Sequence, residues 1–524
     1  MGTAARKLIG ILAALSMAAM APPAGAARPA AAAPLANRPV KAADFVVVYP
    51  GAYTAREAEL VRAYLASNAA LQARGPVDVQ ALVHGTLPKD TPGIGPVVSV
   101  TEAMVRYDNA KYDWENPLRL DAAYARAAGF QDILAYPTFG AHDDTFMVPW
   151  PGKARDTLLV SDLNHSVSVH RPIYPGDTLY LVANERTVTD VTPPEGSIYR
   201  SIVIQTKGSV YNQRGEKVND VVFRVTESVK QYKDGLAPAN PTFADFWEAP
   251  EWRQRPAHFY TDKDWARIKA IWAAEKRRGA EPLYWEDVKV GDSPTPTLDG
   301  PVETSVSPTA PWGMGLGGSR TLKKEIMDPA LVGTLVRSAD DGIYRTADRT
   351  AQVPVPPGAT IPPGGGGAVA VPAASTGASG GAVETADIHK AREDGRAIMI
   401  NYMGRDMAIR HLGNWMGDRG TLRNIRWSIM APSAHHANGK DVPTSPLSER
   451  FLWRVPALQG RAVTAHPMTG DVALVRSYVS DKYVRDGAFF VDLAWWIETI
   501  DGQIYEEGGA TVELPSKRAT GAGG

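Results

Sequence analysis

The chain has 524 residues, with 56 lysines and arginines against 57 aspartates and glutamates. Its length is enough for two or three cores of ordinary domain size, so we expect more than one domain. The balanced charge argues against nucleic acid or an anionic membrane surface as partner, and the absence of cysteine excludes disulfides, thiol nucleophiles and thiolate metal sites.

The N-terminus has the pattern of a secretory signal. Arg6 and Lys7 precede an apolar stretch from Leu8 to about Ala21, which small residues follow. We therefore expect residues 1–26 to be a cleavable signal peptide. A membrane anchor is the alternative, but the apolar run is shorter than the roughly 20 residues of a spanning helix. This predicts a secreted or periplasmic protein with no membrane span after cleavage.

A flexible Ala- and Pro-rich lead-in is expected at residues 27–43, and the first domain at 44–235. A helix should begin near residue 54, because Thr54 and Glu57 are spaced as a capping box. The apolar residues Leu60, Val61, Tyr64 and Leu65 are expected on one face of that helix. From about residue 158 to 229, three runs alternate apolar with polar residues between turns, which predicts an antiparallel meander.

The second part of the chain repeats this order. An aromatic helical connector is expected at residues 236–282 and a second domain at 283–518, with a Gly/Pro-rich insertion at 353–384. After the insertion come a strong helix, "GRAIMINYMGRDMAIRHLGNWMGDRG", whose wide apolar distribution predicts burial, and three further strand runs. The stretch "HRPIYPGD" at 170–177 leads into the first meander, and "HPMTGD" at 466–471 leads into the second.

Several stretches resemble the MaoC-like enoyl hydratases and dehydratases. In the first part these are "NPLRLDAAYARAAGFQDILAYPTFGA" (116–141) and "HRPIYPGDTL"; in the second they are "LYWEDVKVGD", "RHLGNWMGDRG" and the closing strands. The resemblance implies an α+β double hot-dog fold, with two antiparallel sheets that each wrap around a central helix and pair edge to edge. The site would then lie at the junction of the halves.

The resemblance also implies a reaction, the addition or removal of water next to an acyl carbonyl. Such a reaction needs an acid/base pair on one water and a donor to the carbonyl oxygen. The family carries the pair as Asp and His in D-x-N-P-[LIV]-H, whereas this chain has "YDWENPLRLD", with Arg119 in the place of the His. Arginine stays protonated and cannot act as a base. We therefore expect the first domain to be a non-catalytic partner.

Asp387 and His389 are the carboxylate and imidazole nearest to the family's catalytic position in the second domain. The functional interpretation makes them the pair that activates water. The alternative is that they are ordinary residues at a helix start, with Asp387 as its cap.

Four further residues are candidates for substrate binding. Asp406 and Arg410 share a face of the second central helix, where they could hold a substrate carboxylate or form a structural ion pair at the interface. Tyr136 lies in the hydratase-like segment, and His142 stands beside two aspartates, which is also typical of a polar helix edge. No metal or cofactor is expected, since "GMGLGG" (313–318) follows no buried strand and so lacks the setting of a dinucleotide site.

The sequence thus predicts a hydro-lyase for a small carbonyl or acyl compound. The export signal argues against a coenzyme A thioester and favours a free β-hydroxy acid, a ketone or an aromatic side chain. Two alternatives remain open: a hot-dog binding protein that has lost its catalytic residues, and a thioesterase on the same fold. A second copy of the chain, forming a homodimer, is a possible partner.

Overall fold

A computed structural model describes residues 42–141, 157–236, 256–302, 402–430, most of 323–346 (without 328, 330–332 and 334) and most of 449–520 (without 462 and 464–469). The expected signal peptide, the 353–384 insertion, Asp387, His389 and His142 lie outside these residues. Within the described ranges, no helix combines the length and apolar character that crossing a membrane requires.

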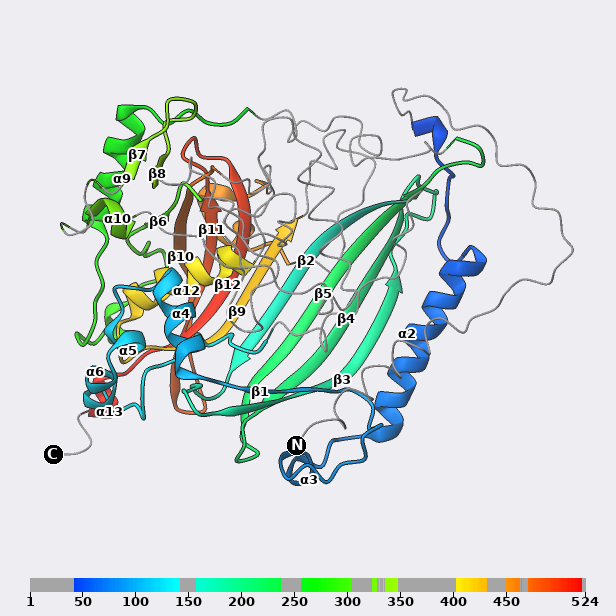
Figure 1. Ribbon diagram of the computed structural model, residues 1–524, viewed down its shortest axis with the longest axis horizontal. Coiled ribbons are helices and arrows are strands. Elements are labelled where there is room, and N and C mark those ends of the chain that lie inside the picture. Colours follow the sequence, from blue (N-terminus) through cyan, green and yellow to red (C-terminus); the bar gives the residue numbers. More distant parts are fainter. Residues whose placement is uncertain are drawn as a thin grey trace, which may run out of the picture.

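Ten strands form one continuous antiparallel sheet, in the order β1-β3-β4-β5-β2-β9-β12-β11-β10-β6 (Figure 1). The first half contributes β1 (Ile94–Ser99), β2 (Thr157–Val169), β3 (Thr178–Asp190), β4 (Arg200–Tyr211) and β5 (Lys217–Gln231). The second half contributes β6 (Thr297–Asp299), β9 (Thr421–Met430), β10 (Ala473–Arg485), β11 (Ala488–Glu498) and β12 (Ile504–Glu513).

The edge-to-edge pairing that was expected is made by β2 and β9, and it joins the two expected sheets into one continuous sheet. Their register runs from Asp162 opposite Met430 to Ser168 opposite Asn424. Each half alone would end in an unpaired edge, whose backbone N–H and C=O groups would need other partners. We call the β2–β9 pairing the seam.

The two strand-entry stretches occupy equivalent places in the two halves. In the first, Gly176 N donates to Val100 O and Val100 N donates to Asp177 O, both at 2.8 Å. The second has the same two bonds, made by Gly470, Val302 and Asp471 at 2.7 and 2.9 Å. Both glycines have a positive φ, of 90° and 88°, which a residue with a Cβ rarely adopts. The repeat seen in the sequence is therefore a repeat in the fold.

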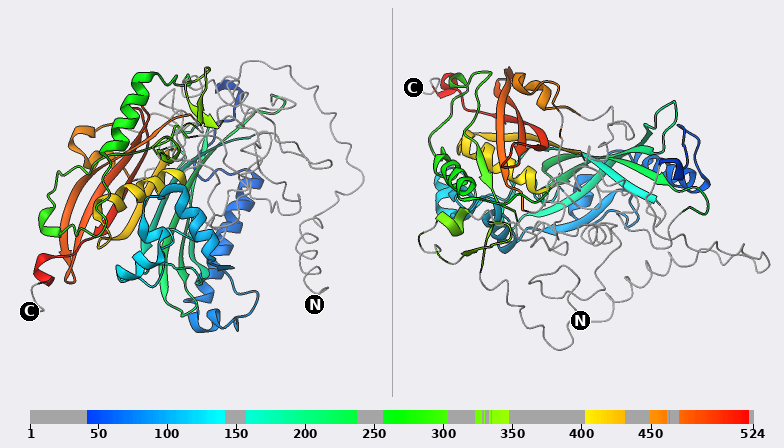
Figure 2. Two further views of the ribbon diagram at one scale, coloured as in Figure 1. Left: turned by 60° about the vertical axis from the view of Figure 1, so that its left-hand side comes forward. Right: turned by 90° about the horizontal axis from the view of Figure 1, so that it is seen from above.

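The central helix of the second half is α12 (Tyr402–Met416), which packs against β9 and β10. Its residues from Gly404 to Leu412 are all buried, as the wide apolar distribution predicted. The short helices α4 (Glu102–Tyr112), α5 (Pro117–Leu120) and α6 (Ala122–Ala127) come from the first half, and Figure 2 shows α4 beside α12. The central helix that the resemblance implies for the first half would follow the stretch 116–141, and residues 142–156 lie outside the described residues.

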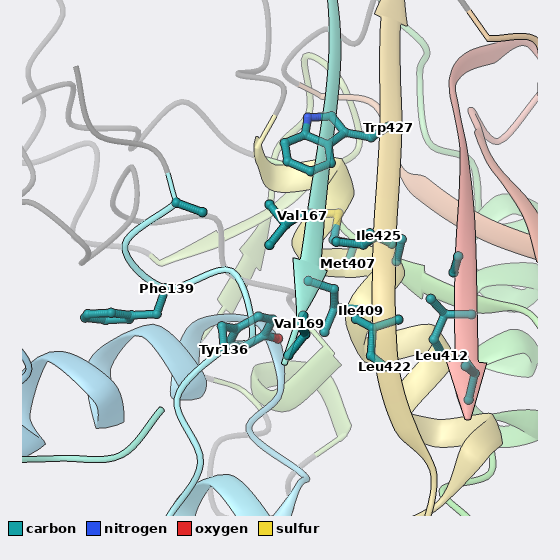
Figure 3. Close-up of a cluster of buried hydrophobic side chains, with 14 of the residues drawn as sticks. Tyr136, Phe139, Val167, Val169, Met407, Ile409, Leu412, Leu422, Ile425 and Trp427 are labelled. Atoms are coloured by element: carbon teal, nitrogen blue, oxygen red, sulfur yellow. The ribbon is translucent and has the colours of Figure 1, made fainter. Parts of the chain in front are cut away.

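One hydrophobic core extends across the seam. Val167 and Val169 of β2 pack with Ile425 and Trp427 of β9 and with Met407 of α12 (Figure 3). The two halves are thus one packed body rather than two cores that touch.

Helix α2 (Ala55–Arg74) covers part of the first half beside β3 (Figure 1). Its capping box is confirmed: Thr54 Oγ1 accepts from Glu57 N, and Glu57 Oε2 accepts from Thr54 N. Tyr64 packs on the sheet with Val61, but Leu65 is 54% exposed, so its expected place on the apolar face is wrong. The buried face of α2 is narrower than predicted, because the helix contacts the sheet along one line.

The connector includes α9 (Asp262–Ala274), which packs near β6 through Trp265, Ile268 and Trp272. The remaining elements are η1 (Ala42–Asp44), α3 (Val79–Val83), η2 (Trp285–Asp287), α10 (Lys323–Met327), β7 (Leu335–Arg337), β8 (Tyr344–Thr346), η6 (Leu452–Arg454), η7 (Pro456–Leu458) and α13 (Lys517–Thr520).

Candidate active site

The hydratase-like segment forms a tight turn at the start of α5. Asn116 caps this helix by accepting from Leu118 N at 3.1 Å, and Pro117 occupies the first helical position, where its missing N–H costs nothing. Asn116 Nδ2 also donates to Asp113 Oδ2 at 2.7 Å. The Asn-Pro pair therefore fixes a buried carboxylate, Asp113, in the turn.

Arg119 occupies the family's histidine position and is tied into this turn. Its Nε donates to Asp113 Oδ2 at 3.0 Å, and its Nη1 donates to Ala135 O at 2.8 Å. The guanidinium lies 4.4 Å above the ring of Tyr136, and the side chain is 12% exposed. Arg119 thus holds the segment together through a permanent positive charge and offers no group that accepts a proton at neutral pH.

Tyr136 lies where this segment meets α12. Burial raises the pKa of Tyr136 well above its ordinary value, the negative charges of Asp113, Asp406 and Asp108 raise it further, and Arg119 opposes them. Tyr136 therefore stays protonated at neutral pH. Two predicted site residues, Tyr136 and Asp406, are brought near each other across the two halves.

Arg410, further along α12, belongs to a buried ion network. It donates to Asp299 Oδ2 at 2.8 Å and to Glu275 Oε2 at 3.1 Å. Glu275 also accepts from Lys323 at 2.8 Å, and Lys323 donates to Glu115 in the hydratase-like turn at 2.6 Å. Of the two roles considered for Arg410, these contacts favour the structural ion pair, because two protein carboxylates already hold the guanidinium.

Asp406 has a different partner. Its Oδ1 accepts from Nε and Nη2 of the preceding residue, Arg405, at 2.7 and 2.6 Å. Arg405 in turn lies 5.1 Å over the ring of Trp427, which is on β9 at the seam. The first turn of α12 therefore places the Arg405–Asp406 ion pair beside the seam.

Two titratable residues near the seam are not among the predicted site residues: His165 on β2 and Glu506 on β12. Both are almost fully buried. Burial and the charge of Arg405 lower the pKa of His165 to about 3, so its ring is neutral at neutral pH. Burial raises the pKa of Glu506 well above its ordinary value, while the charge of Arg405 opposes this and that of Asp406 adds to it.

The sequence held one signal for Glu506. "YEEGGA" places two adjacent glutamates inside a strand, and glutamate is rarely buried unless it has a partner. His165 gave no comparable signal. A further histidine on α12, His411, bonds to Ser477 Oγ at 2.8 Å, and its pKa is lowered to about 3 by burial and Arg410.

The remaining predicted site residues, Asp387, His389 and His142, lie outside the described residues. Among the residues that the structure does describe, no group of three or more His, Asp or Glu side chains is placed to hold a metal ion.

Comparison with known families identifies the central part of the first half. Residues 98–221 match the family model described as "FAS1-like, dehydratase domain region". The dehydratase resemblance is confirmed. The match includes the Asn116 turn, Arg119, Tyr136 and the first strand-entry stretch. No curated protein matches the chain.

Solved structures with similar chains include MaoC-like proteins. A putative MaoC domain protein dehydratase from Chloroflexus aurantiacus is 10% identical, covers 81% of this chain and 94% of its own, and has a TM-score of 0.39. A Mycobacterium tuberculosis protein described as having a double hot-dog fold is 12% identical, covers 84% of this chain and 99% of its own, and has a TM-score of 0.37. The R-hydratase PhaJ1 from Pseudomonas aeruginosa is 24% identical, covers 26% of this chain and 84% of its own, and has a TM-score of 0.18.

Proposed function

We propose that the protein is a hydro-lyase that adds or removes water next to the carbonyl of a small or medium acyl compound. One observation carries this proposal: the segment that matches the dehydratase region forms a buried polar turn, and α4, the helix that leads into this turn, contacts the central helix of the other half. Small-molecule sites commonly lie at such junctions.

In this proposal the water-activating pair is Asp387 and His389. The first half's turn has Arg119, which cannot act as a base, in the place of the family's histidine. Tyr136 and Asp406 contribute to the wall of the site between the halves. Residues 1–26 are proposed to direct export, which would place the protein in the periplasm or outside the cell. N-terminal sequencing of the mature protein would reveal cleavage after Ala26.

The direct test is hydration of the crotonyl thioester of N-acetylcysteamine, followed by loss of the enoyl absorbance and by incorporation of labelled oxygen from water. The wild-type chain is expected to turn this compound over. Asp387→Ala and His389→Ala should each lose about 10² to 10⁴ in rate, the range for a positioned general acid or base. His170→Ala is the matched control, because that imidazole is exposed and bonds to Asp220.

Unchanged turnover in both variants would remove the assignment of the pair. A wild-type chain inactive on thioester, ketone and free-acid enoyl compounds would contradict the hydro-lyase. That result would favour the non-catalytic binding protein, which the replacement of the family's histidine by Arg119 also supports.

A further inference from the structure

The buried ion network around Arg410 connects segments that are far apart in the sequence. Its members are Glu115 in the hydratase-like turn, Glu275 directly after α9, Asp299 on β6, Lys323 on α10 and Arg410 on α12. The bonds form one continuous line from Asp299 through Arg410, Glu275 and Lys323 to Glu115. This line of contacts joins the buried interior beside α12 to the hydratase-like turn.

The charges of this network do not balance. Among the described residues it contains two cations, Arg410 and Lys323, and three carboxylates, those of Asp299, Glu275 and Glu115. With all five groups ionised, the network carries one negative charge in excess. A buried excess charge is unfavourable, because it has lost the hydration that water would supply. One of the carboxylates must therefore bind a proton or move into water.

Asp299 is less well compensated than Glu275. Its side chain is fully buried, its Oδ2 accepts from Arg410, and its Oδ1 has no hydrogen-bond partner among the residues that the structure describes. Glu275 accepts from both cations and also from Leu298 N. Burial raises the pKa of Asp299 to about 6, while Arg410 opposes this and Glu275 adds to it. Of these two buried carboxylates, Asp299 is therefore the one that takes up a proton.

Glu115 is the carboxylate of this network that can reach solvent. Its side chain is 37% exposed, whereas that of Lys323, which donates to it at 2.6 Å, is 7% exposed. The network can thus become neutral in two ways. Either Asp299 is protonated and Glu115 stays beside Lys323, or Asp299 is ionised and Glu115 moves into water.

We propose that the network is a pH-sensitive switch: Lys323 holds Glu115 when Asp299 is protonated, and Glu115 moves into solvent when Asp299 is ionised. The proton is exchanged with solvent. Glu115 directly precedes Asn116, whose side chain caps α5 and bonds to Asp113, so its release changes the hydratase-like turn. The switch does not depend on which reaction the protein catalyses.

Other titratable groups near the network keep their charge where Asp299 titrates. Burial raises the pKa of Tyr505 well above its ordinary value and lowers that of His411 to about 3, so both are neutral. Asp113 acts on Arg410 from the turn, but it is paired with Arg119. Besides the network itself, the titratable groups near Asp299 are Tyr505 on β12, His411 on α12, Asp471 in the second strand-entry stretch and Tyr260 before α9.

The position of the turn can be followed at Trp114, which directly precedes Glu115. The chain is labelled with 5-fluorotryptophan, and the fluorine NMR signal of Trp114 is identified by its loss in Trp114→Phe. In the wild-type chain this signal is expected to move with pH, with a midpoint near pH 6 that Asp299 sets. A Trp114 signal that stays unchanged through this midpoint would overturn the switch.

Two variants test the two ends of the network. Asp299→Asn is neutral at every pH, so it should keep the Trp114 signal at its acid position throughout. Glu115→Gln removes the charge that moves, so the signal should again lose its pH dependence. Glu185→Gln is the matched control and should titrate like the wild type, because Glu185 is 35% exposed and also pairs with a lysine, Lys207. A wild-type titration of Trp114 in either Asp299→Asn or Glu115→Gln would contradict the proposal.

The pH dependence of unfolding tests the site of the proton independently. The pKa of Asp299 is raised from 3.8 to about 6 on folding, so the folded chain binds this proton more tightly. The resulting stabilisation is complete below the lower value and is lost as the pH rises through the higher one. Between them, the unfolding constant should rise about tenfold per pH unit through this site.

Asp299→Asn should remove this contribution to the pH dependence. Asp190→Asn, which loses a partner of the buried Arg200 in the first half, should keep it. Urea unfolding at a series of pH values measures the unfolding constant of each chain. The same pH dependence in the wild type and in Asp299→Asn would place the proton elsewhere and overturn the switch.

Discussion

The two halves each contain a fully buried arginine held by two carboxylates, but in different surroundings. Arg200 in the first half pairs with Glu57 and Asp190, whose side chains are 17% and 10% exposed. Arg410 in the second half pairs with Glu275 and Asp299, at 2% and 0%. Water can reach the carboxylates that pair with Arg200. The carboxylates that pair with Arg410 are shielded from water, so only protein groups compensate their charge. Burial raises the pKa of Asp299 to about 6, although Arg410 opposes this.

The difference shows that two halves with similar folds can bury an arginine in different surroundings. The first half places its arginine between the start of α2 and the β3–β4 connection, with two backbone carbonyls as further acceptors. The second half places charges around its central helix. The interior beside α12 is therefore the part of the molecule that depends most on correct ion pairing.

The largest expected effect is the loss of Arg410. Arg410→Met should lower the free energy of unfolding by about 3–5 kcal/mol, because it leaves the buried Asp299 without its cation and Glu275 with Lys323 alone. Arg200→Met should cost less, since water can solvate its partners. Urea unfolding followed by circular dichroism measures both, with the exposed Arg126, paired with Asp132, changed to Met as control. Equal losses at Arg200 and Arg410 would contradict the comparison.

The next effect concerns space beneath α12. Gly508→Ala should cost about 3 kcal/mol, because the new methyl group would meet both the Trp495 ring and the backbone oxygen of Arg426, at 2.1 and 2.3 Å. Gly413→Ala, within α12, meets no atom within 4 Å and should stabilise the protein by about 0.4–1 kcal/mol. Thermal unfolding of both variants tests this. A neutral Gly508→Ala would mean that the sheet is loosely packed where β12 lies between β9 and β11.

The third prediction uses a property that the halves share. His165 and His411 have a pKa of about 3, against about 6.5 when unfolded, so the unfolded chain binds an extra proton at each site between these values. Stability from each histidine is therefore complete above pH 6.5 and falls by about 1.4 kcal/mol per pH unit below it. His165→Asn and His411→Asn should each flatten the dependence of unfolding free energy on pH by this amount. If the slope of unfolding free energy against pH stayed unchanged in one of the two variants, the histidine of that half would not share this property.

The smallest effect is expected at the seam itself. Asn424 Nδ2 donates across it to Ser166 Oγ and Ser168 Oγ, both at 3.0 Å. Asn424→Ala should cost about 1 kcal/mol, the usual value of a hydrogen bond in a folded protein. Thr421→Ala, at an exposed position of the same strand, should change the unfolding free energy by less than about 0.5 kcal/mol. A loss at Asn424 no greater than at Thr421 would show that side chains do not help to hold the seam.

Much of the local structure could be predicted from sequence, because alternation and capping act over a few residues. The long strands, the capped start of α2 and the burial of α12 were predicted in this way. The family resemblance implied that the two sheets pair edge to edge, but the strands that do so could not be predicted, because β2 and β9 have the same alternation as the other strands. Their pairing joins residues 258 positions apart, as in the bond between Asn424 and Ser166.

The candidate site could be predicted only in the segment that resembles a known family. The Asn116 turn and Arg119 stand in the matched region, and Asp387 and His389 remain predictions. The burial of His165 could not be predicted, because which face of a strand is buried depends on register. Likewise, the partner of Arg410 on the connector, Glu275, is 135 residues away in sequence.

The seam also changes what a mutation does. In a symmetric pair of identical subunits, every substitution appears on both sides of the twofold axis at once. Here the two sides of the β2–β9 pairing come from different parts of the sequence. His165 can therefore lie on one side and Glu506 on the other without either being duplicated. A single chain can thus change one side of the seam by mutation without changing the other.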